Sequence, residues 1–153
     1  MCIRDSDTGV QYLDNTLAPE GQLITWNGTA WDDTAKRVWT SYTPTITAAS
    51  GTWTSVSVTG KYMVAFGICH IQVVITITTR GTGANPVFTL PFPALSGSNK
   101  AVLPATETNV NGKSGVAKIP PGLTTATVYS YDALDLVTAD GAIVSISGSY
   151  PIA

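Results

Sequence analysis

The residues that could carry acid–base, nucleophilic or metal chemistry are few in this sequence. His70 is the only histidine, and residues 34–106 contain no aspartate or glutamate. A Ser-His-Asp triad or a histidine-rich metal site therefore lacks the residues that it needs. The two cysteines, Cys2 and Cys69, are too few for a disulfide scaffold and lack the paired spacing of a zinc site. We expect free thiols, no bound metal, no cofactor and no enzymatic activity.

Each of the remaining polar candidates has a simpler explanation than catalysis. His70 has no carboxylate close in sequence to orient it, which favours a surface or intersubunit histidine over a general base. Cys69 falls on the apolar face of a predicted strand, which favours a buried, unreactive thiol. Asp132, Asp135 and Asp140 occupy one predicted loop. They lack the close acidic spacing and the glycine turn of an EF-hand loop, so a solvated loop is favoured over a calcium site.

Tyr129 and Tyr131 are the candidate contacts for a ligand. Alternation places both on one face of a predicted strand, together with Thr125 and Thr127. Rings with an apolar body and a polar tip can stack on sugars, which would make this pair a glycan contact. The same rings could equally cover the edge of the core.

The elements that position these residues are predicted to be strands. Only 12% of the residues are charged, and the polar surface comes from 23 Thr and 12 Ser, with 14 Gly and 9 Pro available for turns. Such a composition favours strands over helices. The formal net charge of -2 excludes an electrostatic nucleic-acid or membrane binder. No secretory signal is recognisable, and no stretch reaches the about 18 uninterrupted apolar residues of a spanning helix, so no membrane insertion is expected.

Two segments show the clearest strand pattern. In 68–79 the residues alternate between an apolar face and a polar face, with Val74 as the exception. The segment 142–150 repeats the pattern, with Val144, Ile146 and Tyr150 facing inward and three serines outward. The predicted inward residues of the first segment are Cys69, Ile71, Val73, Ile75 and Ile77, and its outward residues are His70, Gln72, Thr76 and Thr78.

Shorter strands are predicted between Gly, Pro and Asn residues. An Asn-Gly pair at 111–112 marks a hairpin, 80–86 is expected to be a flexible loop, and 132–140 is also treated as a loop. About eight to ten strands with regular turns predict an all-β fold, a small antiparallel β-sandwich that is jelly-roll-like. The additional strands are predicted at 52–59, 61–65, 87–90, 101–106, 114–119 and 124–131.

A short hairpin is predicted ahead of the sandwich. We assign 1–40 to an N-terminal linker and Trp-flanked hairpin, and 41–153 to the sandwich domain. In LITWNGTAW the Asn-Gly pair suits a two-residue type I′ turn. Such a turn brings three apolar residues to one face of a hairpin too small to bury them. The candidate assembly surface is therefore Ile24, Trp26 and Trp31, with Trp26 paired to Thr29 and Ile24 to Trp31.

The first residues differ in character from the rest. MCIRDS, at 1–6, resembles a translated sequencing-adapter remnant of the kind found at the ends of metagenomic reading frames. We exclude it from fold reasoning. If it is such a remnant, the natural protein extends further and this chain is a C-terminal piece. A loose native terminus is the alternative.

A series of short motifs runs through the chain. In order, the motifs are WNGTAW, WTSYTPT, GTW (51–53), VTGKY (58–62), FTLPFPA (88–94) and SISGSY (145–150). This series resembles the C-terminal domains of bacteriophage tail-fibre and head-fibre proteins. The resemblance covers roughly residues 20–153, and it departs from the pattern at Ala-Phe-Gly (65–67), where a more polar turn is usual. It implies a small jelly-roll domain, usually trimeric, on the virion surface. Such domains are assembled in the host cytoplasm with other virion proteins and contact host glycans or proteins.

Three function classes follow from these observations. The leading one is a non-enzymatic virion structural protein, the terminal module of a tail or head fibre, involved in host attachment. The alternative is a carbohydrate-binding β-sandwich module of a bacterial surface or secreted protein. The third, a polysaccharide depolymerase, needs paired carboxylates. The acids available for such a pair are Glu107, Asp132, Asp135 and Asp140, with Asp32, Asp33 and the N-terminal acids.

Overall fold

The chain forms two units, Met1–Arg37 and Val38–Ala153, which are described separately. In the computed structural model the described residues are 38–97, 99–131, 136–137 and 139–152, together with the backbone of four short strands in the first unit. Among the residues with a described conformation, no helix is long and apolar enough to span a membrane.

The first unit contains two small antiparallel pairs. β1 (Ile3–Arg4) pairs with β2 (Gln11–Tyr12), and β3 (Thr25–Trp26) pairs with β4 (Trp31–Asp32). The predicted hairpin is thus present, but its predicted register is wrong. Trp26 pairs with Trp31 instead of Thr29, and Thr25 pairs with Asp32. Aromatic residues are favoured at directly opposed positions of paired strands. Ile24 and the side chains of both tryptophans lie outside the described residues.

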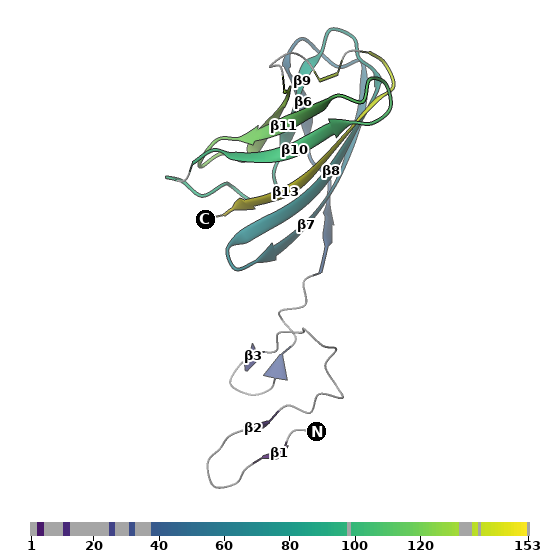
Figure 1. Ribbon diagram of the computed structural model, residues 1–153. Helices are drawn as coiled ribbons and strands as arrows, with labels where there is room; N and C mark the ends of the chain where they lie inside the picture. The colour runs from purple at the N-terminus through teal and green to yellow at the C-terminus, as the bar shows by residue number, and fades with distance from the viewer. Residues whose placement is uncertain are drawn as a thin grey trace. The chain divides into compact units, whose positions relative to one another are not determined.

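The second unit is all-β, as predicted, and its strands form one antiparallel sheet of nine strands (Figure 1). Their order across the sheet is β5-β7-β8-β13-β10-β11-β12-β9-β6. The strands are β5 (Thr40–Tyr42), β6 (Ile46–Ser50), β7 (Ser55–Ala65), β8 (Ile68–Thr79), β9 (Ala84–Thr89), β10 (Ala101–Glu107), β11 (Ser114–Ile119), β12 (Thr125–Ser130) and β13 (Ala142–Pro151).

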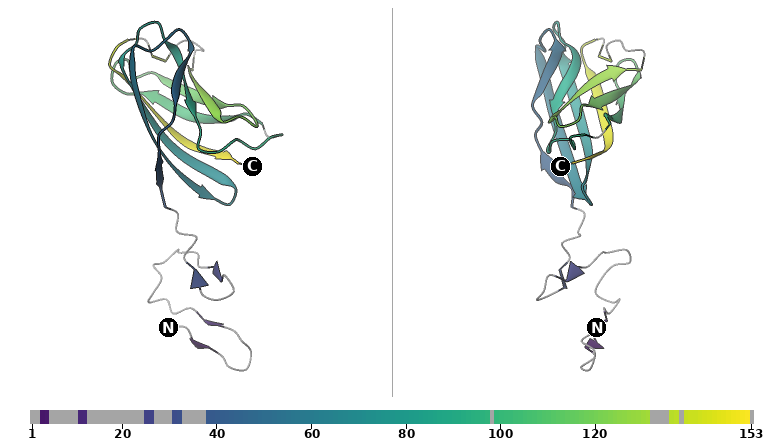
Figure 2. Two further views of the ribbon diagram at one scale, coloured as in Figure 1. Left: turned by 180° about the vertical axis from the view of Figure 1, so that it is seen from behind. Right: turned by 90° about the vertical axis from the view of Figure 1, so that its left-hand side faces the viewer.

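The two edge strands of this sheet, β5 and β6, are consecutive in the chain and lie within residues 40–50. β5 pairs with β7 at one edge, and β6 pairs with β9 at the other, although only residues 43–45 separate β5 from β6. Pro44 lies between β5 and β6 and has no N–H to donate, so strand pairing is interrupted at this position. The N–H and carbonyl of Thr45 bond to the Oγ1 and N–H of Thr89, on the new partner strand. The sheet must therefore curl until its edges meet, as both views of Figure 2 show.

The strands on either side of β10 follow a Greek-key order. β10, β11 and β12 are joined as consecutive antiparallel neighbours, and β13 returns to lie beside β10. The spatial order β13-β10-β11-β12 is that of a Greek key, a motif found in most β-sandwiches.

The core lies inside the curl and matches the predicted alternation. All five predicted inward residues of β8 are at most 1% exposed, while Val74 on the opposite side is 39% exposed. On β13, Val144, Ile146 and Tyr150 are at most 2% exposed. The two long strands pair with each other along ten residues, from Ala142 with Ile77 to Pro151 with Ile68. The predicted strand boundaries at 68–79 and 114–119 are confirmed.

Other boundaries differ from the prediction for identifiable reasons. The strands predicted at 52–59 and 61–65 are one strand, β7, because Gly60 stays extended and the ring of Tyr42 covers it. Residues 84–86 of the predicted loop belong to β9, where Ala84 pairs with Ser50. Neither β5 nor β6 was predicted as a strand.

The turn at 65–67 explains the departure from the fibre motif. Ala65 pairs with Ile68, so Phe66 and Gly67 form a two-residue turn. Their φ angles are 52° and 72°, and a type I′ turn needs positive φ at both positions. Phe66 is 78% exposed at the tip of this turn.

Candidate functional site

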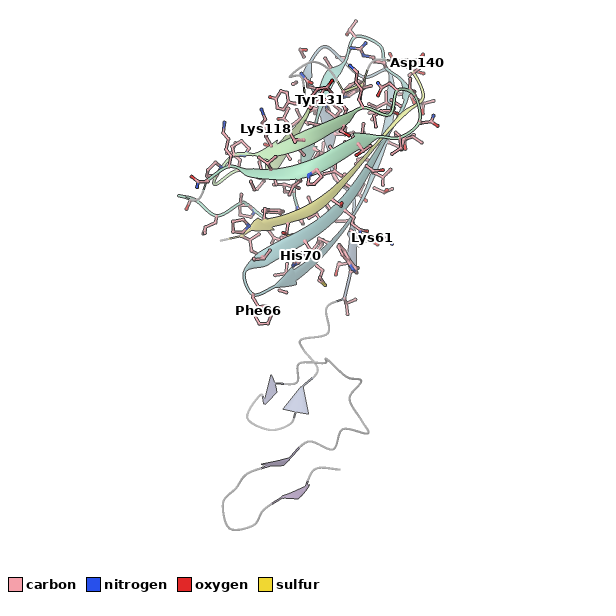
Figure 3. The ribbon with its side chains drawn as sticks, in the orientation of Figure 1. Lys61, Phe66, His70, Lys118, Tyr131 and Asp140 are labelled. Carbon is pink, nitrogen blue, oxygen red and sulfur yellow. The ribbon has the colours of Figure 1, made fainter. Side chains whose placement is uncertain are left out.

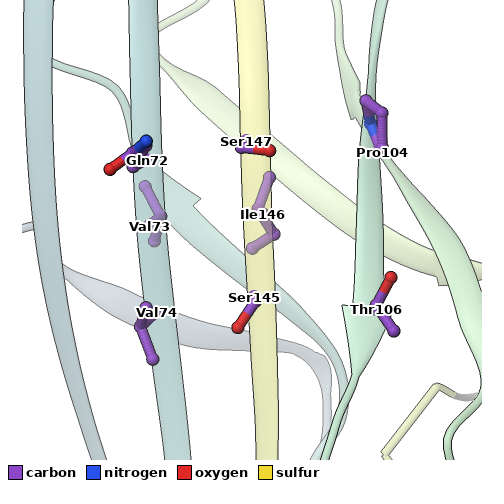
Figure 4. Close-up of a pocket in the computed structure, with 8 residues that line it drawn as sticks. All are labelled: Gln72, Val73, Val74, Pro104, Thr106, Ser145, Ile146 and Ser147. Carbon is purple, nitrogen blue, oxygen red and sulfur yellow. The ribbon is translucent and has the colours of Figure 1, made fainter.

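A shallow groove lies on the outer face of the sheet, over β13 and between β8 and β10 (Figure 4). Its volume is about 290 Å³. Val73 and Ile146 belong to the core, and the other lining residues face outward. The lining residues are Gln72, Val73, Val74, Pro104, Thr106, Ser145, Ile146 and Ser147.

The position of the groove follows from a proline in β10. The N–H of Glu107 bonds toward β11 and that of Thr108 bonds toward β13, so the N–H groups alternate between the two neighbours. By this alternation position 104 should donate toward β13, but Pro104 has no N–H. The pairing of β10 with β13 ends next to it, at Ala105 and Ile146. The groove lies where this pairing ends.

The groove is uncharged, and its surface is mostly apolar with a few hydroxyl and amide groups. Ser145 and Ser147 form a low centre between the longer side chains of β8 and β10. The flanking strands add the amide of Gln72 and the hydroxyl of Thr106 beside the apolar surface of Val74. These groups can exchange hydrogen bonds with hydroxyl groups of a ligand. The polar side chains that line the groove carry hydroxyl groups or, at Gln72, an amide.

The groove continues across the sheet as two transverse rows of outward residues. Directly paired residues of an antiparallel sheet lie on the same side, so the register defines each row. We call these the Tyr129 row and the Tyr131 row. The Tyr129 row is Lys61, Gln72, Ser147, Pro104, Val116 and Tyr129. The Tyr131 row is Thr59, Val74, Ser145, Thr106, Ser114 and Tyr131.

Both tyrosines singled out from the sequence therefore lie on the same face as the groove. Tyr129 is half-buried on β12, and the Nζ of Lys118 lies 4.8 Å from the centre of its ring. Tyr131 follows the end of β12, donates its N–H to the carbonyl of Ser114 at 3.3 Å, and is 78% exposed (Figure 3). The sequence pointed to the tyrosines but not to the groove, because cross-strand neighbours depend on register. The outward serines of β13 were the only local signal.

His70 and Cys69 lie next to each other on β8, on opposite faces of the strand. His70 is half-buried on the outer face of β8, between Met63 and Ser149 in the register. Cys69 is fully buried, as predicted. Burial raises the pKa of its thiol, which a hydrogen bond with Tyr150 offsets only in part. A thiol that is buried and protonated is a poor nucleophile.

Glu107 is a buried carboxylate that binds its own backbone. It is 0% exposed, and backbone N–H groups donate to its two oxygens at 2.6 to 3.2 Å. Burial alone would raise its pKa, but these donors outweigh burial and lower the pKa to about 2. Both oxygens are thus engaged in the fold, so Glu107 is unavailable for sugar cleavage. The donors are Asn109, Val110, Asn111 and Gly112 in the β10–β11 loop, and Ile143 at the start of β13.

Of the loop acids considered above together with Glu107, the structure describes Asp140. Asp140 accepts the N–H of Arg80 at 2.7 Å, and Asp132 and Asp135 lie outside the described residues. Within the described ranges, no three His, Cys, Asp or Glu residues gather where they could hold a metal ion.

Exposed apolar side chains gather near the β7–β8 turn. Val64 is 42% exposed, Phe66 78% and Ile68 40%. Val38 and Trp39, 59% and 40% exposed, directly precede β5, whose Thr40 pairs with Tyr62 near the same turn. We call these five residues the apolar end.

Comparison with known proteins adds no relative to this description. No family model, no curated protein and no solved structure matches the chain.

Proposed function

We propose that this protein is a non-enzymatic virion structural protein, the terminal module of a phage tail or head fibre that takes part in host attachment. The order of short motifs from WNGTAW to SISGSY, which resembles fibre C-terminal domains, supports this proposal. In this proposal the protein is assembled in the host cytoplasm with other virion proteins and is displayed on the particle surface.

The observation that carries the proposal is the outer face of the sheet. It combines an uncharged groove, two transverse rows in which hydroxyl and amide groups alternate with apolar side chains, and an aromatic end at Tyr129 and Tyr131. Polar groups that are rigidly spaced beside exposed rings suit recognition of a surface sugar or protein. Cys69 and Glu107 are buried in the core, and His70 is half-buried on the outer face of β8.

We further propose that the curled sheet is a compact jelly-roll-like sandwich. The Greek-key order of β13, β10, β11 and β12 supports this assignment, since Greek keys build most sandwiches. The closure of the sheet by residues 40–50 agrees with a small fold that leaves few strand edges open.

We propose that the working unit is a homotrimer. The apolar end supports an association surface, because contiguous exposed apolar side chains commonly mark an interface. The predicted surface at Ile24, Trp26 and Trp31 remains part of this proposal.

The same outer face also favours a second candidate, a carbohydrate-binding module of a bacterial surface or secreted protein. Both candidates bind a surface ligand without cleaving it. They differ in location, because a fibre module belongs to a phage particle and the alternative belongs to a bacterial cell or its secretions.

The test measures binding and cleavage together. The fluorescently labelled chain is incubated with a panel of bacterial strains and with their purified capsular and wall polysaccharides. We expect binding to some strains without release of new reducing ends. Immunogold labelling of phages that adsorb to those strains should then mark the virions. Polysaccharide cleavage would contradict the non-enzymatic role, and labelling of cells alone would favour the second candidate.

A further inference from the structure

The exposed charged side chains on the strands of the curled sheet are all positive. Strands β5 to β13 contain a single acidic residue, Glu107, and it is fully buried. Their basic residues are Lys61 on β7 and Lys118 on β11, and both are exposed. The outer face of these strands therefore presents positive charge without any carboxylate to balance it.

Both lysines flank the groove. Lys61 pairs with Gln72, a lining residue, at one end of the Tyr129 row. Lys118 lies next to that row at its other end, where its Nζ is 4.8 Å from the ring centre of Tyr129. This cation–π contact holds the ammonium group beside the aromatic end of the face. The lysines are thus separated by the uncharged groove.

The length of the face suits a chain-like ligand. From β7 to β12 the row crosses six strands, and neighbouring strands are about 4.8 Å apart, so it extends over roughly 24 Å along the sheet. A single small molecule would contact only part of it. An oligomer that repeats hydroxyl groups and negative charges would meet both lysines and the serines between them.

Resting on the proposed attachment function, we infer that this face binds an acidic oligosaccharide, one that carries carboxylate groups on its sugars. The lysines pair with carboxylates at each end of the bound segment. Ser145, Ser147 and Gln72 exchange hydrogen bonds with ring hydroxyls. Tyr131, which is 78% exposed, stacks on a sugar ring beyond the groove.

Nucleic acid does not fit the same pattern. Two lysines on the whole face neutralise too few phosphates to give useful affinity at physiological salt. Surface lysines paired with a carboxylate contribute modestly, so specificity has to come from the uncharged side chains of the two rows as well.

The experiment uses the full chain and four carboxylated probes: oligogalacturonate, oligosialic acid, hyaluronan oligosaccharide and oligoguluronate. Each probe is compared with its carboxyl-reduced form by calorimetry. We expect at least one acidic probe to bind, its reduced form to bind more weakly, and affinity to fall with added salt. Lys61→Gln and Lys118→Gln should each weaken binding about two- to fivefold, and Tyr131→Ser about two- to tenfold.

Lys100→Gln is the matched control, because Lys100 is exposed in the loop before β10, outside both rows, and lacks the contact with the Tyr129 ring that places Lys118 beside the face. It should leave the affinity unchanged, and all four variants should keep the parent melting temperature. The inference is overturned if no acidic probe binds, if the reduced forms bind equally well, or if the control weakens binding as much as Lys118→Gln. It is also overturned if Lys61→Gln, Lys118→Gln or Tyr131→Ser changes the sedimenting mass, since the outer face would then be a contact between copies of the chain. Cell binding without binding of acidic probes would refute this inference alone, whereas loss of both would refute the attachment function too.

Discussion

At the scale of single residues, Glu107 is the least expected side chain. Carboxylates are almost never fully buried unless they are paired, and from the sequence Glu107 was considered only among the acids available for a catalytic pair. The structure instead surrounds it with backbone donors from the turn-forming segment that follows and from β13. A sequence shows where turn residues lie but not that their N–H groups converge on one carboxylate. Glu107 thereby fastens the β10–β11 loop to the start of β13.

Replacing this carboxylate should be costly. In Glu107→Gln the side chain keeps its size, but one oxygen becomes an NH₂ group that faces backbone donors. We expect the free energy of unfolding to fall by about 2 to 4 kcal/mol, measured by urea denaturation. Asp140→Asn is the control, since Asp140 accepts one backbone N–H, from Arg80, and is exposed. Equal losses in the two variants would contradict the role given to Glu107.

The same carboxylate should make stability depend on acid. Its pKa falls from an ordinary value of 4.5 to about 2 on folding, so the folded state favours the ionised form. The resulting stabilisation, about 3 kcal/mol, is fully present above pH 5 and is lost as the pH falls toward 2. Denaturation curves between pH 6 and pH 2 should show the difference between parent and Glu107→Gln shrinking over this range. A constant difference would show that the ionised form contributes nothing.

At the scale of elements, alternation of polar and apolar residues predicted the long strands with one polar face. It missed the short strands that are defined only by pairing with a neighbouring strand. β8 and β13 alternate cleanly and were found with nearly correct ends. β5 and β6 have three and five residues, too few for a periodic signal, and they are defined by their partners β7 and β9. β7 appeared interrupted because glycine usually weakens a strand, and the ring that covers Gly60 comes from β5.

This explanation of β7 predicts the sign of a substitution. Strand propensity alone favours Gly60→Ala, since glycine is the poorer strand residue. The structure predicts the opposite, because the new methyl group would overlap the Tyr42 ring. We expect a loss of about 1 to 3 kcal/mol by urea denaturation. In a Tyr42→Ala background the loss should largely disappear, so a double-mutant cycle measures the coupling. Stabilisation by Gly60→Ala alone would refute the contact.

At the scale of the whole molecule, composition was enough to predict an all-β fold, but not the way in which the sheet closes. The sheet curls because residues 40–50 form both of its edge strands, β5 paired with β7 and β6 paired with β9. These pairings join segments that are distant in the sequence. The groove has the same origin, since it lies where two strands stop pairing. Features of this kind arise from register, and one-dimensional patterns carry little information about register.

The apolar end supplies the test of association. Phe66 occupies a turn position with a φ of 52°, where a bulky residue is strained and asparagine is at ease. Local stability therefore favours Phe66→Asn, which creates the Asn-Gly pair preferred in type I′ turns. Phe66, which is 78% exposed in this turn, is therefore the side chain whose replacement tests the proposed association.

Phe66→Asn should consequently act in opposite directions on the fold and on the assembly. We expect the variant subunit to unfold at the same or a higher urea concentration than the parent at equal dilution. Sedimentation of the full chain at tens of micromolar should show a trimer for the parent and a shift toward monomer for the variant. The double variant Trp26→Ser, Trp31→Ser examines the predicted N-terminal surface in the same way. If the parent sediments as a monomer and neither change alters its mass, the proposal that the apolar end mediates self-association is wrong.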